Sequence, residues 1–240
     1  MLKIFLAIFI LMIIFSSTAD AKSIRTPEGS FPRVQWAVVE STPGNLEKIS
    51  EIGARVLAKT SAAESGTYAL YGVVEKNNPD LMRLLEIYES DEAYRIHSTS
   101  ENFQKYRAER FQFLKNLRLL PVNGIVLEQK DGEIGKFVIT TKFEVKAENL
   151  IEFQNLMSDE YFRAVEKNSD VVGMFLTAEK ENPNIFHTMN IFKDENSYKN
   201  YLNSAENKNL REKIKNMILS EKNIEYLPTK ISMTGKGARK

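Results

Sequence analysis

The strongest constraint on the fold of this chain is an internal duplication. The segment Glu75–Pro79 returns as Glu179–Pro183, and Ile87–Tyr94 returns as Ile191–Tyr198. Both matches have the same offset of 104 residues, and no insertion separates them. Similarity at one fixed period indicates a duplicated structural unit. We therefore predict two copies of one fold in tandem.

Residues 1–21 have the pattern of a secretory signal peptide. Lys3 precedes the apolar run Ile4–Phe15, and Ala19-Asp20-Ala21 fits an A-x-A cleavage site. The apolar run is shorter than the roughly 20 residues that a membrane-spanning helix needs. The alternatives are an uncleaved anchor or a buried helix. We expect a periplasmic or secreted protein with no stable membrane span after cleavage.

Composition excludes several classes of site. The chain has no cysteine, which rules out disulfides, thiol nucleophiles and a lipidated cysteine. Its formal net charge is +1, whereas nucleic-acid binding needs a concentrated basic surface. We find no metal-ligand cluster, P-loop or dinucleotide glycine pattern. We therefore expect no metal, no nucleotide cofactor and no nucleic-acid partner.

Each copy is long enough for one small domain, and hydrophobic periodicity gives the same order of elements in both. In the first copy, residues 31–130, we expect strands at 34–41, 67–76, 81–88 and 117–129, a helix after Pro43-Gly44-Asn45, and a helical region at 90–115 that breaks near Ser98–Ser100. In the second copy, residues 136–233, we expect strands at 137–146, 171–180, 184–193 and 223–232 and helices at 148–167 and 196–219. The linker is Asp131–Gly135. This βαββαβ order predicts an α+β fold of two ferredoxin-like repeats.

Alternation along the third strand divides its side chains between two sheet faces. Leu85 and Ile87 lie on one side, and Leu84, Glu86 and Tyr88 lie on the other. We expect the apolar pair to meet the helices and the mixed side to face a second sheet. Two fused copies can supply that sheet within one chain, packed face to face as a barrel. The alternative is that each copy pairs with another chain.

The first copy resembles a known family. Four segments carry the resemblance. They are Glu64–Tyr71 at the start of the second strand, Leu85–Tyr88 at the end of the third, and then Asp91–His97 and Asn102–Tyr106. These segments are similar to antibiotic-biosynthesis-monooxygenase domains, in particular the quinol monooxygenase branch of the dimeric α+β barrel superfamily. The resemblance covers roughly residues 34–128. It extends to the second copy mainly because that copy is similar to the first.

The resemblance implies a cofactor-free oxygenase whose aromatic or quinol substrate supplies the electrons. That branch often carries two histidines after the third strand. His97 matches the first of them, and Asn102 stands where the second would be. Related haem-degrading proteins place a tryptophan at the position of His97 and a haem-binding histidine after it, and this chain has neither. Haem cleavage is therefore not expected.

Such chemistry needs a base, a binding surface for an aromatic ring and exclusion of water. His97 is the candidate base, because its ordinary pKa lies near neutral. Glu86 would orient His97 or bind a substrate hydroxyl, and Tyr71, Tyr88 and Trp36 would line the pocket. We assign Trp36 to the barrel face. We interpret Tyr94, Tyr106 and His187 as structural.

The two copies differ at every candidate site position. At the offset of 104, the counterparts of Trp36, Tyr71, Glu86, Tyr88 and His97 are Thr140, Phe175, Asn190, Phe192 and Tyr201. The turns and the apolar positions are retained. We therefore predict one active half and one structural half, which makes either a monomeric pseudo-dimer or a homodimer.

Three functions are compatible with the sequence. The first is a cofactor-free monooxygenase acting on a small aromatic or quinol molecule. The second is an isomerase or mutarotase of a small carbonyl compound, in which His97 and Glu86 would move a proton without oxygen. The third is a non-catalytic periplasmic ligand-binding protein. A fold alone does not separate them.

Overall fold

A computed structural model describes residues 21–131, 135–229 and 238–239, so residues 1–20 of the signal peptide predicted at 1–21 lie outside the described residues. The first repeat contains β2 (Arg33–Ser41), α1 (Leu46–Ala63), β3 (Thr67–Glu75), β4 (Asn78–Tyr88), α2 (Asp91–Thr99), α3 (Glu101–Arg110), the short helix η1 (Phe111–Phe113) and β5 (Leu114–Lys130). The second contains β6 (Phe137–Val145), η2 (Ala147–Asn149), α4 (Leu150–Lys167), β7 (Val171–Glu179), β8 (Ile185–Phe192), α5 (Glu195–Asn203), α6 (Ala205–Ile214) and β9 (Ile218–Pro228). Both therefore have the predicted βαββαβ order.

The offset found in the sequence also relates the structures of the two repeats. The bounds of α4, β7, α5 and α6 exceed those of α1, β3, α2 and α3 by 104 residues at both ends. Two expected elements of the second copy were placed wrongly. The helix predicted at 196–219 is two helices separated at Ser204, and β9 begins at Ile218 rather than at 223. Ser204 is the counterpart of Ser100, and both hydroxyls cap the helix that follows them.

The strands of the two repeats form one closed barrel of eight strands. Their order is β5-β2-β4-β3-β9-β6-β8-β7, and β7 pairs again with β5. The last strand of each repeat makes the connection. The first part of β5 pairs with β2 and its second part with β7, whereas β9 pairs with β6 and, near Pro228, with β3. The predicted one-chain α+β barrel is confirmed, because each repeat supplies the strands that close the other half.

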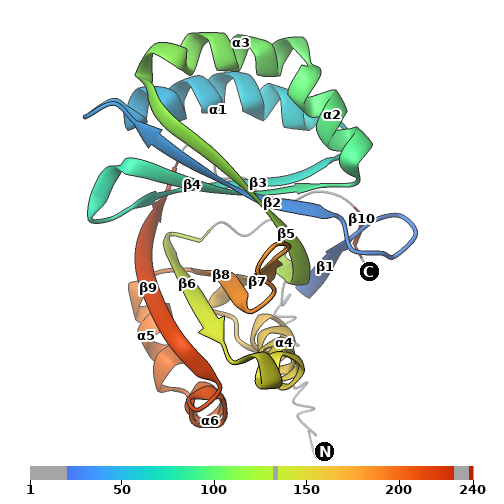
Figure 1. Cartoon of the computed structure of the whole chain (residues 1–240), viewed down its shortest axis with the longest axis vertical. Coiled ribbons are helices and arrows are strands. Elements are labelled where there is room, and N and C mark those ends of the chain that lie inside the picture. Colours follow the sequence, from blue (N-terminus) through green and yellow to red (C-terminus); the bar gives the residue numbers. More distant parts are fainter. Residues whose placement is uncertain (1–20, 132–134, 230–237, 240) are drawn as a thin grey trace, which may run out of the picture.

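The helices lie outside this barrel. Figure 1 shows α1, α2 and α3 over one half and α4, α5 and α6 over the other, with the strands between them. A cluster of buried apolar side chains fills the interior, and it includes Trp36, Leu85, Ile87 and Phe175. This overturns the predicted assignment of the strand faces. The pair Leu85 and Ile87 faces the barrel interior, and the mixed side of β4 faces the helices.

Two further strands extend the sheet beside the barrel. Strand β1 (Ala21–Arg25) pairs with β5 and with the short strand β10 (Ala238–Arg239). The Ser23 hydroxyl donates a hydrogen bond to Glu128 on β5. Within the described part of the chain, no helix combines the length and the apolar character that a bilayer crossing requires.

Candidate functional site

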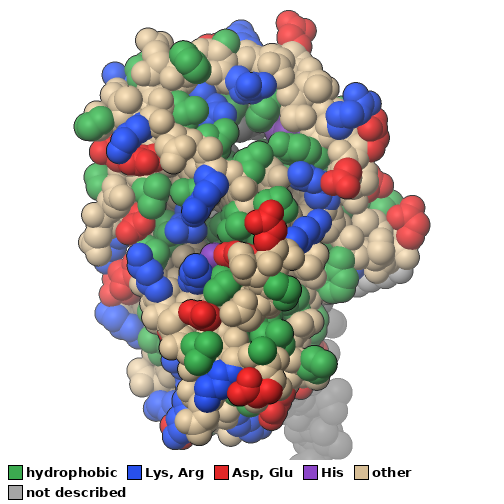
Figure 2. Space-filling view, viewed as in Figure 1, with side chains coloured by type: hydrophobic (Ala, Val, Ile, Leu, Met, Phe, Trp, Pro, Cys, Tyr) green, Lys and Arg blue, Asp and Glu red, His purple; other side chains and the backbone are tan. Residues whose placement is uncertain are grey.

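A cavity of about 440 Å³ lies between the outer face of the first repeat's sheet and helices α2 and α3. In Figure 2, the face in view is hollowed between these helices and the strands beneath them. Its lining residues are Gln35, Ala37, Val39, Leu70, Leu84, Glu86, Tyr88, Tyr94, His97, Ser98, Thr99, Phe103, Gln104, Tyr106, Arg107, Arg110, Leu117 and Leu119. This volume is in the range of small-molecule sites in proteins. We call it the first cavity.

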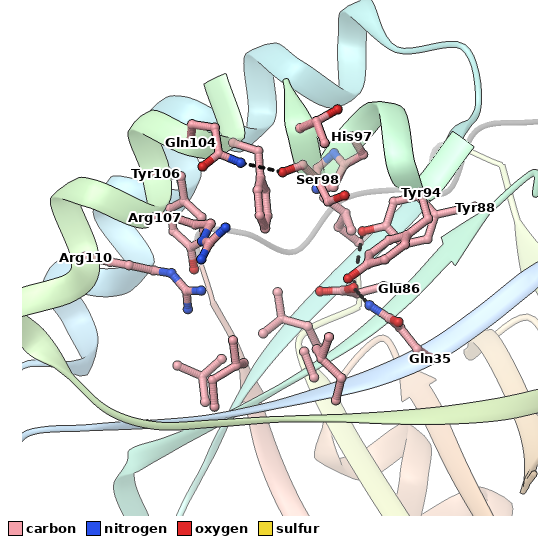
Figure 3. A pocket seen from close by; sticks show the side chains of 18 residues that line it. Gln35, Glu86, Tyr88, Tyr94, His97, Ser98, Gln104, Tyr106, Arg107 and Arg110 are labelled. Carbon is pink, nitrogen blue, oxygen red and sulfur yellow. Dashed lines mark hydrogen bonds between the residues drawn. The ribbon is translucent and has the colours of Figure 1, made fainter. Parts of the chain in front are cut away.

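Strand β4 places Glu86 and Tyr88 in the first cavity because alternate residues point to the same side of a strand. Gln35, on the neighbouring strand β2, donates a hydrogen bond from Nε2 to Glu86 Oε2. The Tyr88 hydroxyl donates to the same oxygen at 3.2 Å. These contacts appear in Figure 3. The Glu86 carboxylate is therefore held in one orientation by two neutral donors.

The protonation of these groups follows from their burial. Burial raises the pKa of the Glu86 carboxyl above its ordinary value, and Gln35, His97, Tyr88 and Arg33 oppose this only in part. Burial and the nearby Glu86 also raise the pKa of Tyr88 well above its ordinary value, which keeps its hydroxyl a proton donor. Glu86 is thus a stronger base than an ordinary glutamate.

His97 enters the first cavity from the last turn of α2. Ser90 caps the start of this helix by accepting from the backbone N–H of Ala93 at 3.1 Å. The His97 side chain is 2% exposed, and its Nδ1 lies 2.8 Å from Oε2 of Glu64. Because a carboxylate accepts hydrogen bonds, we assign the proton to Nδ1, which leaves the lone pair on Nε2. The Thr67 hydroxyl donates to the same Glu64 oxygen at 2.8 Å.

The predicted helix break is confirmed, and it shapes this wall of the first cavity. The Ser100 hydroxyl donates to the His97 carbonyl oxygen at 2.9 Å and accepts from the Phe103 backbone N–H at 3.3 Å. The ring of His97 lies 4.8 Å from that of Phe103 and 5.3 Å from that of Tyr88, measured between ring centroids. The imidazole is therefore held between two aromatic rings that also line the cavity.

Two candidate site residues do not reach this cavity. Trp36 faces the barrel interior, as predicted, and its Nε1 donates to the Thr177 hydroxyl at 3.1 Å. Tyr71 packs there against Phe175, with 5.1 Å between ring centroids. The structure thus brings Glu86, Tyr88 and His97 together and leaves Trp36 and Tyr71 on the other side of the sheet. The reason is that Glu86 and Tyr88 face the helices rather than the barrel interior, where Trp36 and Tyr71 lie.

Other polar residues of the first cavity were missed from the sequence. Gln35, Arg107 and Arg110 all line it, and so do Tyr94 and Tyr106, for which the sequence predicts a structural role. A fuller comparison of the copies would have identified Gln35 and Arg110, because Gln35 aligns with Ile139 and Arg110 aligns with Ile214. Each is a polar residue in the first repeat and an apolar one in the second.

The second repeat has a corresponding but smaller cavity, of about 220 Å³. We call it the second cavity. Counterparts of first-cavity residues line it, among them Asn190 for Glu86, Tyr201 for His97 and Arg211 for Arg107. Asn190 donates from Nδ2 to the Tyr161 hydroxyl at 2.9 Å. This cavity therefore lacks the carboxylate and the imidazole of the first.

The other histidine of the chain lies on the barrel side. His187 on β8 contacts Glu179 on β7 through Nε2 at 2.8 Å, and its ring centroid is 6.1 Å from that of Trp36. Burial lowers the pKa of His187, although Glu179 opposes this. The residue is not part of either cavity lining. Among the described residues, no three His, Asp or Glu side chains form a group that could hold a metal ion.

The fold is a two-repeat α+β barrel with a cavity between sheet and helices in each repeat, and the first cavity contains Glu86 and His97. Residues 33–109 match the family model described as antibiotic biosynthesis monooxygenase. The match confirms the resemblance predicted from the sequence, and it covers the strands and helices that line most of the first cavity. No curated protein matches the chain in sequence.

Solved structures share this fold over most of the chain. A "putative monooxygenase" from Lactobacillus acidophilus NCFM has a TM-score of 0.79 and 14% identity, covering 87% of this chain and 98% of that one. A protein of the same description from Fusobacterium nucleatum subsp. nucleatum has a TM-score of 0.79 and 20% identity, covering 88% and 97%. An anthrone oxidase-like protein has a TM-score of 0.51 and 10% identity, covering 82% and 92%. At these identities the likeness shows the fold.

Proposed function

We propose that this protein is a monooxygenase that oxidises a small phenolic or quinol substrate with dioxygen in the first cavity. The observation that carries the proposal is the convergence of Glu86, Tyr88 and His97 on that cavity. The match of residues 33–109 to the antibiotic biosynthesis monooxygenase model supports it, as does the fold shared with an anthrone oxidase-like protein.

The reaction would begin with removal of a phenolic proton from the bound ring. Glu86 is placed for this step, because its carboxylate is fixed by Gln35 and Tyr88 and burial raises its pKa. His97 offers a second base through Nε2, since Glu64 holds Nδ1. The rings of Tyr88 and Phe103 would bind the substrate ring by stacking and limit the access of water.

The electrons would come from the substrate, so no cofactor is required. A phenolate gives up electrons to dioxygen more readily than the neutral phenol does. One oxygen atom forms a bond to a ring carbon, and the other leaves as water with two hydrogens from the substrate. One hydroquinone and one dioxygen thus give one hydroxyquinone and one water.

Oxygen uptake tests this proposal. The purified protein is mixed with a panel of hydroquinones in an oxygen electrode, and the products are identified by mass spectrometry after labelling with ¹⁸O₂. We expect uptake that depends on the protein and one labelled oxygen atom in each product. Proton exchange or sugar-type isomerisation without uptake would favour an isomerase, and ligand-dependent thermal stabilisation without turnover would favour a binding protein.

We further propose that the protein is exported and acts as a monomer. The signal-peptide pattern at 1–21 supports export. The closure of one barrel by two repeats of the same chain supports a monomer, because the second repeat occupies the position of a partner subunit. N-terminal sequencing of the protein from the periplasm would test cleavage after Ala21, and light scattering would measure the mass in solution.

A further inference from the structure

The first cavity has two chemically different ends. Figure 3 shows Glu86 and Gln35 on one side and Arg107 and Arg110, from α3, on the other. The acid–base groups of the proposed reaction lie at the first end. The two arginines have no role in that reaction, and their presence in a small cavity needs its own explanation.

Arg110 is buried without a carboxylate. The residue is 5% exposed, and no described residue accepts a hydrogen bond from its Nε. Its guanidinium carbon lies 4.6 Å above the centre of the Tyr106 ring, which supplies a cation–π contact. Among the described residues, none forms an ion pair with it. A buried charge that lacks an anionic partner is costly, so a site of this kind is stabilised when an anion binds.

The second repeat shows the paired form of the same position. Arg211, the counterpart of Arg107, makes an ion pair of 2.6 Å with Glu221. In the first repeat the counterpart of Glu221 is Leu117, which lines the cavity. The counterpart of Arg110 is Ile214, so the second repeat has one arginine and one carboxylate where the first has two arginines and a leucine.

We propose that the first cavity takes an aromatic substrate with a carboxylate, bound by Arg110 and Arg107 at the end opposite Glu86. An arginine guanidinium binds a carboxylate through paired, charge-assisted hydrogen bonds, which would satisfy the unpartnered Nε of Arg110. A ring held in this way would direct its phenolic hydroxyl toward Glu86 and His97. This assignment of the two ends rests on the proposed function, whereas the binding of an anion by the arginines does not.

The test compares two ligands that differ in one charge. Gentisate, a hydroquinone carrying a carboxylate, and its uncharged methyl ester are titrated into the full-length protein without oxygen, by calorimetry. We expect gentisate to bind at least about tenfold more tightly, and Arg110→Met and Arg107→Met each to reduce this preference. Arg110→Lys, which keeps the charge, should retain part of it. Arg211→Met in the second repeat is the matched control and should leave both affinities unchanged.

Equal affinity for the acid and the ester in the wild-type protein would overturn the inference. A preference that survives both Arg110→Met and Arg107→Met would also overturn it. Because binding is measured without oxygen, tight gentisate binding with no oxygen uptake would reject the proposed reaction alone. Oxidation of neutral hydroquinones with no preference for gentisate would reject the anionic substrate alone.

Discussion

The two repeats have the same element order and matching bounds for most of their helices and strands, yet their cavities differ in size and chemistry. The first cavity holds about 440 Å³ and contains a carboxylate, an imidazole and two arginines. The second holds about 220 Å³, and its arginine is paired with Glu221. Once two copies are joined in one chain, only one needs to keep a site. The other still has to supply β6, β7, β8 and β9 to the closed barrel.

Replacement of Glu86 should have the largest effect on this contrast. Glu86→Gln removes the proposed base but keeps a side chain of the same shape, and we expect kcat/KM to fall roughly 100- to 10,000-fold. The control is Asn190→Ala at the matching position of the second cavity, which should leave kcat/KM near the wild-type value. Oxygen uptake per folded protein measures both. A comparable loss in both variants would contradict the assignment of one active half.

Replacement of His97 should have a smaller effect, because Glu86 remains. We expect His97→Gln to lower kcat/KM by about 100-fold. Among the described residues, none hydrogen-bonds the buried hydroxyl of its counterpart Tyr201, so Tyr201→Phe should preserve both activity and stability. Steady-state kinetics and thermal unfolding of the two variants check this. Full activity in His97→Gln would remove the residue from the proposed mechanism.

Replacement of Trp36 tests whether the barrel side of the sheet contributes to stability and the cavity side to activity. Trp36→Phe loses the hydrogen bond to Thr177 and leaves a void in the barrel interior. We expect the free energy of unfolding to fall by about 1–3 kcal/mol, with kcat/KM of the remaining folded protein unchanged. Urea unfolding and oxygen uptake measure the two effects. A strong rise in KM without loss of stability would show that Trp36 takes part in substrate binding, contrary to its position in the barrel interior.

The smallest expected effect is a dependence of stability on pH that comes from Glu86. Its pKa in the folded protein lies above the ordinary value of 4.5, so the folded state binds this proton more tightly than the unfolded state. The contribution of Glu86 to stability therefore falls as pH rises from the ordinary pKa through the raised one. Relative to wild type, Glu86→Gln should be stabilised more at about pH 8 than at about pH 5. Denaturant unfolding at both pH values measures the difference, and an equal or reversed difference would contradict the raised pKa.

Local patterns predicted most of the elements of this fold. The repeat established two copies, and turn and cap residues such as Ser100 located the break between α2 and α3. The helix expected at 196–219 ends too late, because Leu210, Ile214 and Met217 continue an apolar helical pattern beyond the end of α6 at Ile214. The first copy already indicated that this helix is broken, since Ser204 is the counterpart of Ser100.

The candidate site was predicted only in part. Glu86, Tyr88 and His97 do share one cavity, but Trp36 and Tyr71 lie across the sheet from it. Alternation along β4 separates two sets of side chains, and it does not say which set meets the helices when both faces are covered. The sequence pattern predicts that the apolar pair Leu85 and Ile87 meets the helices. Instead, Leu85 and Ile87 are buried in the apolar cluster of the barrel interior, where they are removed from water.

The sequence by itself determined that this protein is a duplicated α+β unit with its candidate acid–base residues in the first copy. Both an internal repeat and a local periodicity are visible in the order of residues, without knowledge of which distant segments come into contact. Tertiary structure alone decided that the cavity lies outside the barrel, beneath α2 and α3, and that Arg107 and Arg110 face Glu86 across it. These relations depend on how β5 and β9 cross from one repeat to the other. Such long-range pairing leaves no trace in a local pattern, since it joins strands that are distant along the chain.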